Sequence, residues 1–209
     1  MTTLKSPIHA FVLLFAAAFA YGQDATAPST GSGLPAGVSL PRTGMVYVFD
    51  GAGELIKVHP TEILSNSHAA GNMARGIIYA GPRATVELQG LRSEIHLNSR
   101  QPLLYVRLNL EEPDLTRRQI HLIRLEQTKD RRVVLTFGQN VFGGHRSKHY
   151  DDIAIDKADA EPDVWLKITP SAPLAPGEYG IVLMPSDVGL SPDTVYDFDV
   201  DVEDEKPGK

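Results

Sequence analysis

The sequence contains no cysteine, which excludes a disulfide scaffold, a cysteine-ligated zinc finger, a thiol nucleophile and a lipid-modified N-terminal cysteine. Glycine and proline, at 18 and 15 of 209 residues, are too few for a low-complexity chain. With 42% hydrophobic and 22% charged residues, the composition is that of an ordinary globular protein. A chain of this size buries a core large enough to fold without disulfides.

Long apolar runs are confined to the N-terminus. Lys5 precedes an uncharged apolar run over 10–20, and small residues follow, so a signal peptide is predicted over 1–22, cleaved after Ala20 or Gly22. The alternative is an uncleaved anchor or a buried helix, but this run falls short of the roughly 20 residues that a spanning helix needs. We expect bacterial-type export to the periplasm or the medium, with no transmembrane segment after signal removal.

The remaining chain divides by composition. Residues 23–43 consist mostly of Gly, Pro, Ser, Thr and Ala and are predicted to form a flexible lead-in. Residues 204–209 form a charged tail. The body, residues 44–203, is expected to be one domain, with two small domains as the alternative.

The body is predicted to be all-β, because short runs rich in β-branched and aromatic residues recur between turn signals, as in antiparallel sandwiches and closed antiparallel sheets. The glycines at 51 and 53 and the segment 128–131 predict hairpin turns. Little helix is expected, with single turns at 60–64 and 151–160. The predicted strands are 45–50, 54–59, 76–80, 84–88, 94–98, 103–110, 119–127, 132–137, 164–169, 179–184 and 195–202.

Alternation is clearest in the last of these strands. In residues 195–202, apolar side chains at the even positions share one face, and Asp197, Asp199 and Asp201 share the other. We expect the apolar face to pack against a core and the aspartates to meet water.

One turn resembles a known family. The segment 174–179 (LAPGEY) resembles the L-x-P-G-x-Y turn of fibronectin III-like and other immunoglobulin-like sandwiches, where the tyrosine forms a tyrosine corner. The resemblance implies an antiparallel immunoglobulin-like β-sandwich, here with an additional N-terminal hairpin, and a Tyr179 hydroxyl bonded back across the turn. Trp165 is expected in the core. The resemblance implies no activity.

Two histidines have a spacing that a metal site can use. His145 and His149 are four residues apart, but Arg146 and Lys148 would repel a cation and the glutamate of H-E-x-x-H is missing. An exposed polar loop is the preferred interpretation.

Other catalytic signals are equally incomplete. His96 and His121 alternate with apolar residues and are expected on solvent faces of strands. There is no G-x-S-x-G motif, and the nearness of Ser147 to His149 in sequence says nothing about geometry. We therefore predict no catalytic residue, no metal ligand and no cofactor.

An acidic stretch raises calcium as a possible ligand, since hard oxygen ligands suit this ion. No D-x-D-x-D-G loop is present and Lys157 interrupts the group, so solvated charge is preferred over an ion site. The acidic residues are Asp151, Asp152, Asp156, Asp159, Glu161 and Asp163.

Charge is distributed unevenly along the chain. Residues 23–149 carry 15 Lys and Arg against 11 acids, whereas residues 150–209 carry 4 against 15. The segment 117–132 is predicted to be a basic ribbon, with candidate binding residues Arg117, Arg118, Arg124, Lys129, Arg131 and Arg132. The preferred interpretation is that acidic C-terminal strands neutralise this ribbon internally. The second is a binding face for an anionic partner, and nucleic acid is not expected.

These observations predict an exported, non-enzymatic accessory or interaction domain. Its expected partner is an anionic cell-surface polymer or another exported protein. The alternatives are a secreted hydrolase or a calcium-dependent binding protein whose site is formed by residues distant in sequence.

Overall fold

The computed structural model describes residues 34–35, 38–49, 54–67, 84–139, 146–187 and 191–201. The predicted signal peptide, the predicted strand at 76–80, His145 and the charged tail lie outside the described residues. Within the described part of the chain, no helix is long and apolar enough to cross a membrane.

Three antiparallel sheets make up the described residues, which confirms the predicted all-β class. Sheet A has the strand order β13-β14-β7-β1-β2. Its strands are β1 (Val46–Phe49), β2 (Leu55–Val58), β7 (Leu103–Arg107), β13 (Ile155–Glu161) and β14 (Trp165–Pro170). The pairing of β1 with β2 confirms the first predicted hairpin.

Sheet B has the order β12-β8-β15-β16-β3, and the short strand β6 adds to β16 in parallel. Its strands are β3 (Pro60–Glu62), β6 (His96–Leu97), β8 (Ile120–Arg124), β12 (Asp151–Ile153), β15 (Gly177–Leu183) and β16 (Thr194–Val200). Sheet C has the order β11-β10-β5-β4, with β9 beside β10. Its strands are β4 (Leu64–Ser67), β5 (Ala84–Gln89), β9 (Glu126–Gln127), β10 (Arg131–Gln139) and β11 (Arg146–His149).

Sheet B packs on both of its faces. One face joins sheet A in a shared core that contains Phe198 and Ile181 of sheet B and Leu104 of sheet A. The other face joins sheet C, where Val195 packs in one cluster with Leu135. The central strands β8, β15 and β16 are therefore covered on both sides.

This second cover corrects the expectation for the last strand. The alternation in β16 is present, but Asp197 and Asp199 are buried on the face that was expected to meet water, where Arg132 of sheet C contacts Asp197 and His96 of β6 contacts Asp199. Of the three aspartates, only Asp201 is exposed.

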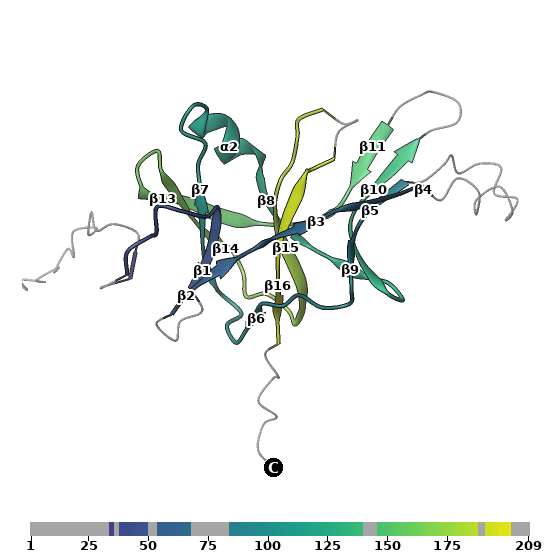
Figure 1. Cartoon of the computed structure of the whole chain (residues 1–209), viewed down its shortest axis with the longest axis horizontal. Helices are drawn as coiled ribbons and strands as arrows, with labels where there is room; N and C mark the ends of the chain where they lie inside the picture. Colours follow the sequence, from purple (N-terminus) through teal and green to yellow (C-terminus); the bar gives the residue numbers. More distant parts are fainter. Residues whose placement is uncertain are drawn as a thin grey trace, which may run out of the picture. The chain divides into compact units, whose positions relative to one another are not determined.

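Two extended segments form the edges of all three sheets. Strands β2, β3 and β4 follow one another with one residue between each pair, and each is the edge strand of its sheet (Figure 1). Strands β11, β12 and β13 do the same at the opposite edges. We call residues 55–67 and 146–161 the two edge ribbons. The predicted helical turns at 60–64 and 151–160 are therefore wrong, and both segments are strands.

A third cluster lies on the outer face of sheet A. The rings of Tyr47 and Trp165 meet edge to face with centroids 5.8 Å apart, which confirms Trp165 as a core residue. Leu34 and Leu40 pack against the same cluster, so part of the predicted flexible lead-in contacts the body.

The helix α2 (Pro113–Gln119) was not predicted. Pro113 begins it and Asp114 lies in the first turn, whereas Arg117 and Arg118 lie in the last, an arrangement that suits the helix dipole. Gln119 therefore belongs to the helix and not to the predicted strand.

The turn before β15 has the predicted geometry. The Tyr179 hydroxyl donates a 2.7 Å hydrogen bond to the carbonyl oxygen of Ala175, four residues earlier. The tyrosine ring stacks on Phe198 in the core between sheets A and B, with ring centroids 5.9 Å apart. The turn thus fixes how β15 enters the core.

Candidate functional site

The structure divides the predicted basic ribbon into two groups. Arg117 and Arg118 lie on α2, which precedes β8, and the other candidates lie at or beyond the far end of that strand. A five-residue strand is about 16 Å long. The six residues therefore fall into two groups at opposite ends of β8, and their role in binding stays a prediction.

Most of these basic residues have internal partners. The guanidinium of Arg124 lies 6.0 Å from the ring centroid of Tyr179, and Arg131 donates a 2.9 Å hydrogen bond to Glu87. On α2, Arg117 pairs with Asp159. Lys129 lies exposed in the turn between β9 and β10.

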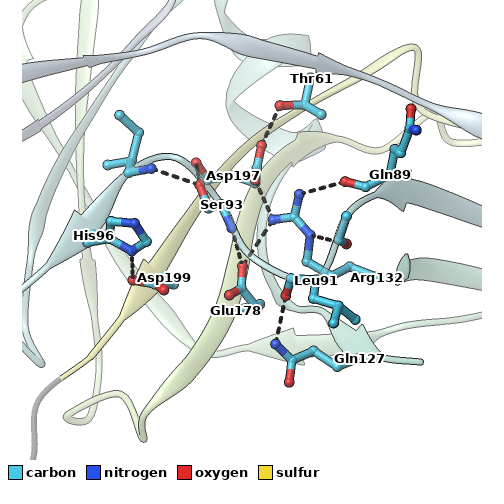
Figure 2. A network of polar contacts seen from close by, with 12 residues as sticks. Thr61, Gln89, Leu91, Ser93, His96, Gln127, Arg132, Glu178, Asp197 and Asp199 are labelled. Carbon is cyan, nitrogen blue, oxygen red and sulfur yellow. Dashed lines mark hydrogen bonds and ion pairs between the residues drawn. The ribbon is translucent and has the colours of Figure 1, made fainter. Parts of the chain in front are cut away.

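Arg132 is the centre of a buried polar cluster between sheets B and C (Figure 2). Its Nη1 lies 3.0 Å from Glu178 Oε2 and 2.5 Å from Asp197 Oδ2, and all three side chains are at most 5% exposed. Its Nε and Nη2 donate to the carbonyl oxygens of Gly90 and Gln89, both at 3.3 Å.

Two further residues complete this cluster. Thr61 donates its hydroxyl proton to Asp197 Oδ1, and Ser93 donates its backbone N–H to Glu178 Oε2 at 2.9 Å. We call Arg132, Glu178, Asp197, Thr61 and Ser93 the Arg132 cluster. A small hollow of about 160 Å³ opens onto it.

The cluster has more buried acid than buried base. Asp199 is also buried and lies 2.8 Å from Nδ1 of the half-exposed His96. Burial raises the pKa of Glu178, and the charge of Asp199 adds to this increase, although hydrogen bonds from Ser93 and Arg132 oppose it. Glu178 therefore binds a proton more readily than an exposed glutamate does.

The Arg132 cluster confirms, for Arg132, the interpretation that acidic C-terminal strands neutralise the basic segment. Each guanidinium nitrogen of this residue has an acceptor inside the protein. Arg132 is thus unavailable to an external anion, which corrects its place among the candidate binding residues.

Arg118 lies in a different environment. It is exposed at the end of α2 and, within the described residues, takes part in no ion pair. It borders a hollow of about 460 Å³ between α2, the start of β8, the edge ribbon 146–161 and the residues that follow β15. We call this the basic hollow. Its lining residues are Arg118, Gln119, His121, Ser147, Lys148, Tyr150, Met184, Pro185 and Ser186, with no acidic side chain among them.

Hydrogen bonds hold Lys148 and His121 in place at the basic hollow. Lys148 Nζ donates to the carbonyl oxygen of Pro185 at 2.9 Å, and His121 Nδ1 lies 3.1 Å from Asp152 Oδ1. The rings of His121 and Tyr150 meet edge to face, with centroids 5.7 Å apart. Partial burial lowers the pKa of Lys148, and the charge of Asp187 opposes this decrease.

Of the two histidines considered for a metal, His149 lacks the helical context that the spacing requires, and His145 lies outside the described residues. His149 lies on strand β11, where its Nε2 is 2.9 Å from Ser147 Oγ. The predicted exposed loop is therefore wrong at 146–149, although the His149 side chain is exposed.

The acidic stretch does not form a calcium cage. Its residues lie along β12, β13 and the following turn, where Asp152 contacts His121 and Asp159 contacts Arg117. Over the residues described, no group of three or more His, Asp or Glu side chains is placed to hold a metal ion.

Sequence reasoning missed Lys148, Tyr150 and Ser186 as members of a polar site. The first two lie in the stretch 145–152, in which the two histidines form the more familiar motif. Basic and hydroxyl residues alternate in that stretch, and this pattern could have indicated a polar site. The contact of the stretch with α2 depends on tertiary structure and cannot be read from the sequence.

No protein-family model, curated protein or solved structure matches this chain.

Proposed function

We propose that the protein is an exported, non-enzymatic interaction domain that binds an anionic cell-surface polymer at the basic hollow. The observation that carries the proposal is the gathering of Arg118, His121 and Lys148, from three separate elements, around a hollow without acidic lining. A cationic concave surface concentrates anions and steers their association.

The contrast with the Arg132 cluster supports this choice of site. There, buried carboxylates neutralise the arginine, so its contribution is to folding. At the basic hollow, Arg118 is exposed and Lys148 has a carbonyl oxygen as its hydrogen-bond acceptor, so both retain charge for a ligand.

The test is retention of the mature protein on columns carrying a sulfated polymer or a lipopolysaccharide, at low and at physiological salt. We expect retention that weakens with salt and is lost in Arg118→Glu, with Lys129→Glu as the control for an equal change of charge at an exposed site. Equal retention of wild type and Arg118→Glu on every column contradicts the proposed site.

A secreted hydrolase is the second candidate, because Ser147 Oγ and His149 Nε2 lie at hydrogen-bond distance on an exposed strand. Within the described residues, no carboxylate contacts His149 to orient it. Labelling of the wild type, but not of Ser147→Ala, by a fluorophosphonate would support hydrolysis. Absence of labelling leaves binding as the preferred function.

A further inference from the structure

Two fixed positive charges, Arg118 and Lys148, line the basic hollow. Lys157 lies at the end of α2, where its Nζ donates to the carbonyl oxygens of Arg117 and Ile120 at 2.8 and 2.9 Å. The neighbouring acids are Asp152, which contacts His121, and Asp187, whose charge acts on Lys148. The lining itself thus holds two fixed positive charges and no carboxylate, and Asp152 and Asp187 lie next to it.

Hydrogen bonds occupy several of the carbonyl oxygens at the end of α2 that would otherwise repel an anion. Helix C-termini carry partial negative charge on their last carbonyl oxygens. Here the backbone N–H of Ile120 donates to Thr116, and that of Met184 donates to Gln119 at 2.7 Å. With the two bonds from Lys157, most of the terminal carbonyl oxygens are occupied.

The donors around the hollow fit a group with several acceptor oxygens. Lys148 uses one of its three protons on Pro185, which leaves two for a ligand. Arg118 supplies a planar fork, and the hydroxyls of Tyr150 and Ser186 are further donors. A phosphate monoester has three terminal oxygens and a charge of about −1.5 to −2 at neutral pH, so it satisfies more of these donors than a carboxylate does.

The hollow is large enough for an anionic group with a larger body. A volume of about 460 Å³ holds roughly fifteen waters at about 30 Å³ each, well beyond one phosphate group. Met184 and Pro185 add an apolar part to the lining. A sugar ring attached to the phosphate presents hydroxyls to Gln119 and C–H groups to this apolar part.

On these grounds, and given that the proposed function holds, we infer that the basic hollow binds a phosphate monoester carried on a sugar, with Arg118 and Lys148 as its charged ligands. The sugar phosphate is either a free small molecule or a unit of the proposed polymer. Both sources present the same chemistry to the site.

The experiment is titration calorimetry of the full mature chain with hexose 6-phosphate, hexose 6-sulfate and a hexuronate. We expect the phosphate to bind at least about tenfold more tightly than the other two, because it satisfies additional charged hydrogen bonds. Arg118→Glu and Lys148→Gln are each expected to weaken phosphate binding about tenfold or more, whereas Lys129→Glu leaves it unchanged.

The two sources are distinguished by a phosphate-bearing polysaccharide, assayed before and after phosphatase treatment. Binding to the untreated polymer that exceeds binding to free hexose phosphate, and that is lost after treatment, assigns the site to the polymer. Tighter binding of free hexose phosphate assigns it to the small molecule.

Several outcomes overturn the inference. Equal affinity for hexuronate and hexose phosphate would contradict the phosphate class while leaving the proposed function intact. If phosphatase treatment of the polymer does not change retention on the columns, the phosphate class is likewise contradicted and the proposed function is left intact. Undiminished phosphate binding by Arg118→Glu, which we expect to keep the fold because Arg118 is exposed, refutes this location. Failure to bind any polymer or monoester rejects both the inference and the proposed function.

Discussion

Arg132 and Arg118 both belong to the basic segment, yet the structure places them in opposite situations. Arg132 lies between two sheets with its guanidinium bonded to Glu178 and Asp197, whereas Arg118 is exposed on a hollow without acidic lining. The comparison teaches that sequence counts of charge do not identify a binding surface. The contacts that a charged side chain makes in the folded protein determine whether it stabilises the fold or is available to bind a ligand.

The largest expected effect is the loss of the Arg132 side chain. Arg132→Met leaves Glu178 and Asp197 buried without their cation, and we expect the free energy of unfolding to fall by about 3–5 kcal/mol. Urea denaturation followed by fluorescence of Trp165 measures this loss. The matched change Arg118→Met is expected to cost less than about 0.5 kcal/mol. Equal losses of unfolding free energy in the two variants would contradict the distinction between a structural Arg132 and an exposed Arg118.

The next effect concerns pH. Because burial raises the pKa of Glu178 above its ordinary 4.5, the folded state holds a proton that the unfolded state has released once the pH exceeds 4.5. The stabilisation that proton binding at Glu178 gives to the folded state is therefore fully present below pH 4.5. It is lost as the pH rises through the folded-state pKa of Glu178.

Glu178→Gln removes this titration, and the difference in unfolding free energy between wild type and variant should change by at most about 1.4 kcal/mol per pH unit. Denaturation curves above pH 4.5 measure it. The exposed Glu126→Gln is the control. If the wild type instead gains stability relative to Glu178→Gln as the pH rises, folding lowers the pKa of Glu178 and the expectation is wrong.

A smaller effect is expected from Thr61, which donates to Asp197 from the edge strand β3. Thr61→Val keeps the shape but removes the donor, and a loss of about 1–2 kcal/mol in unfolding free energy follows from a lost bond to a charged group. A double-mutant cycle with Asp197→Asn measures the coupling. No coupling between the two substitutions would show that this bond contributes nothing.

The smallest effect on stability is predicted at the basic hollow. Arg118→Glu should change the free energy of unfolding by no more than about 0.5 kcal/mol, because the residue is exposed and takes part in no ion pair within the described residues. Denaturation of this variant beside wild type is the measurement. A loss as large as that of Thr61→Val would show that Arg118 has a structural role.

The sequence predicted the central strands better than the edges. The strand β14 and the turn before β15 were found because Trp165 and Tyr179 lie in apolar runs between clear turn signals. Apart from β2, which lies within the predicted strand 54–59, the edge ribbons were missed. Strands such as β4 (LSNS) and β11 (RSKH) have polar sequences, so apolar alternation is weak in them.

The site was less predictable than the fold. Arg132 is 46 residues from Glu178 and 65 from Asp197, so no local pattern reveals their contact. Alternation in β16 correctly separated Asp197 and Asp199 from the apolar face, but it does not tell whether water or another sheet covers the polar face. Arg118 was a candidate from charge alone, and its neighbours in the hollow come from three other segments of the chain.

The two edge ribbons also affect how the protein comes apart. Each passes from sheet to sheet with a single residue between strands, so neither ribbon has a linker long enough to let one sheet detach while the others stay paired. Opening sheet C would pull β3 and β12 away from sheet B, and through them β2 and β13 away from sheet A. We therefore expect the three sheets to share one cooperative unfolding transition.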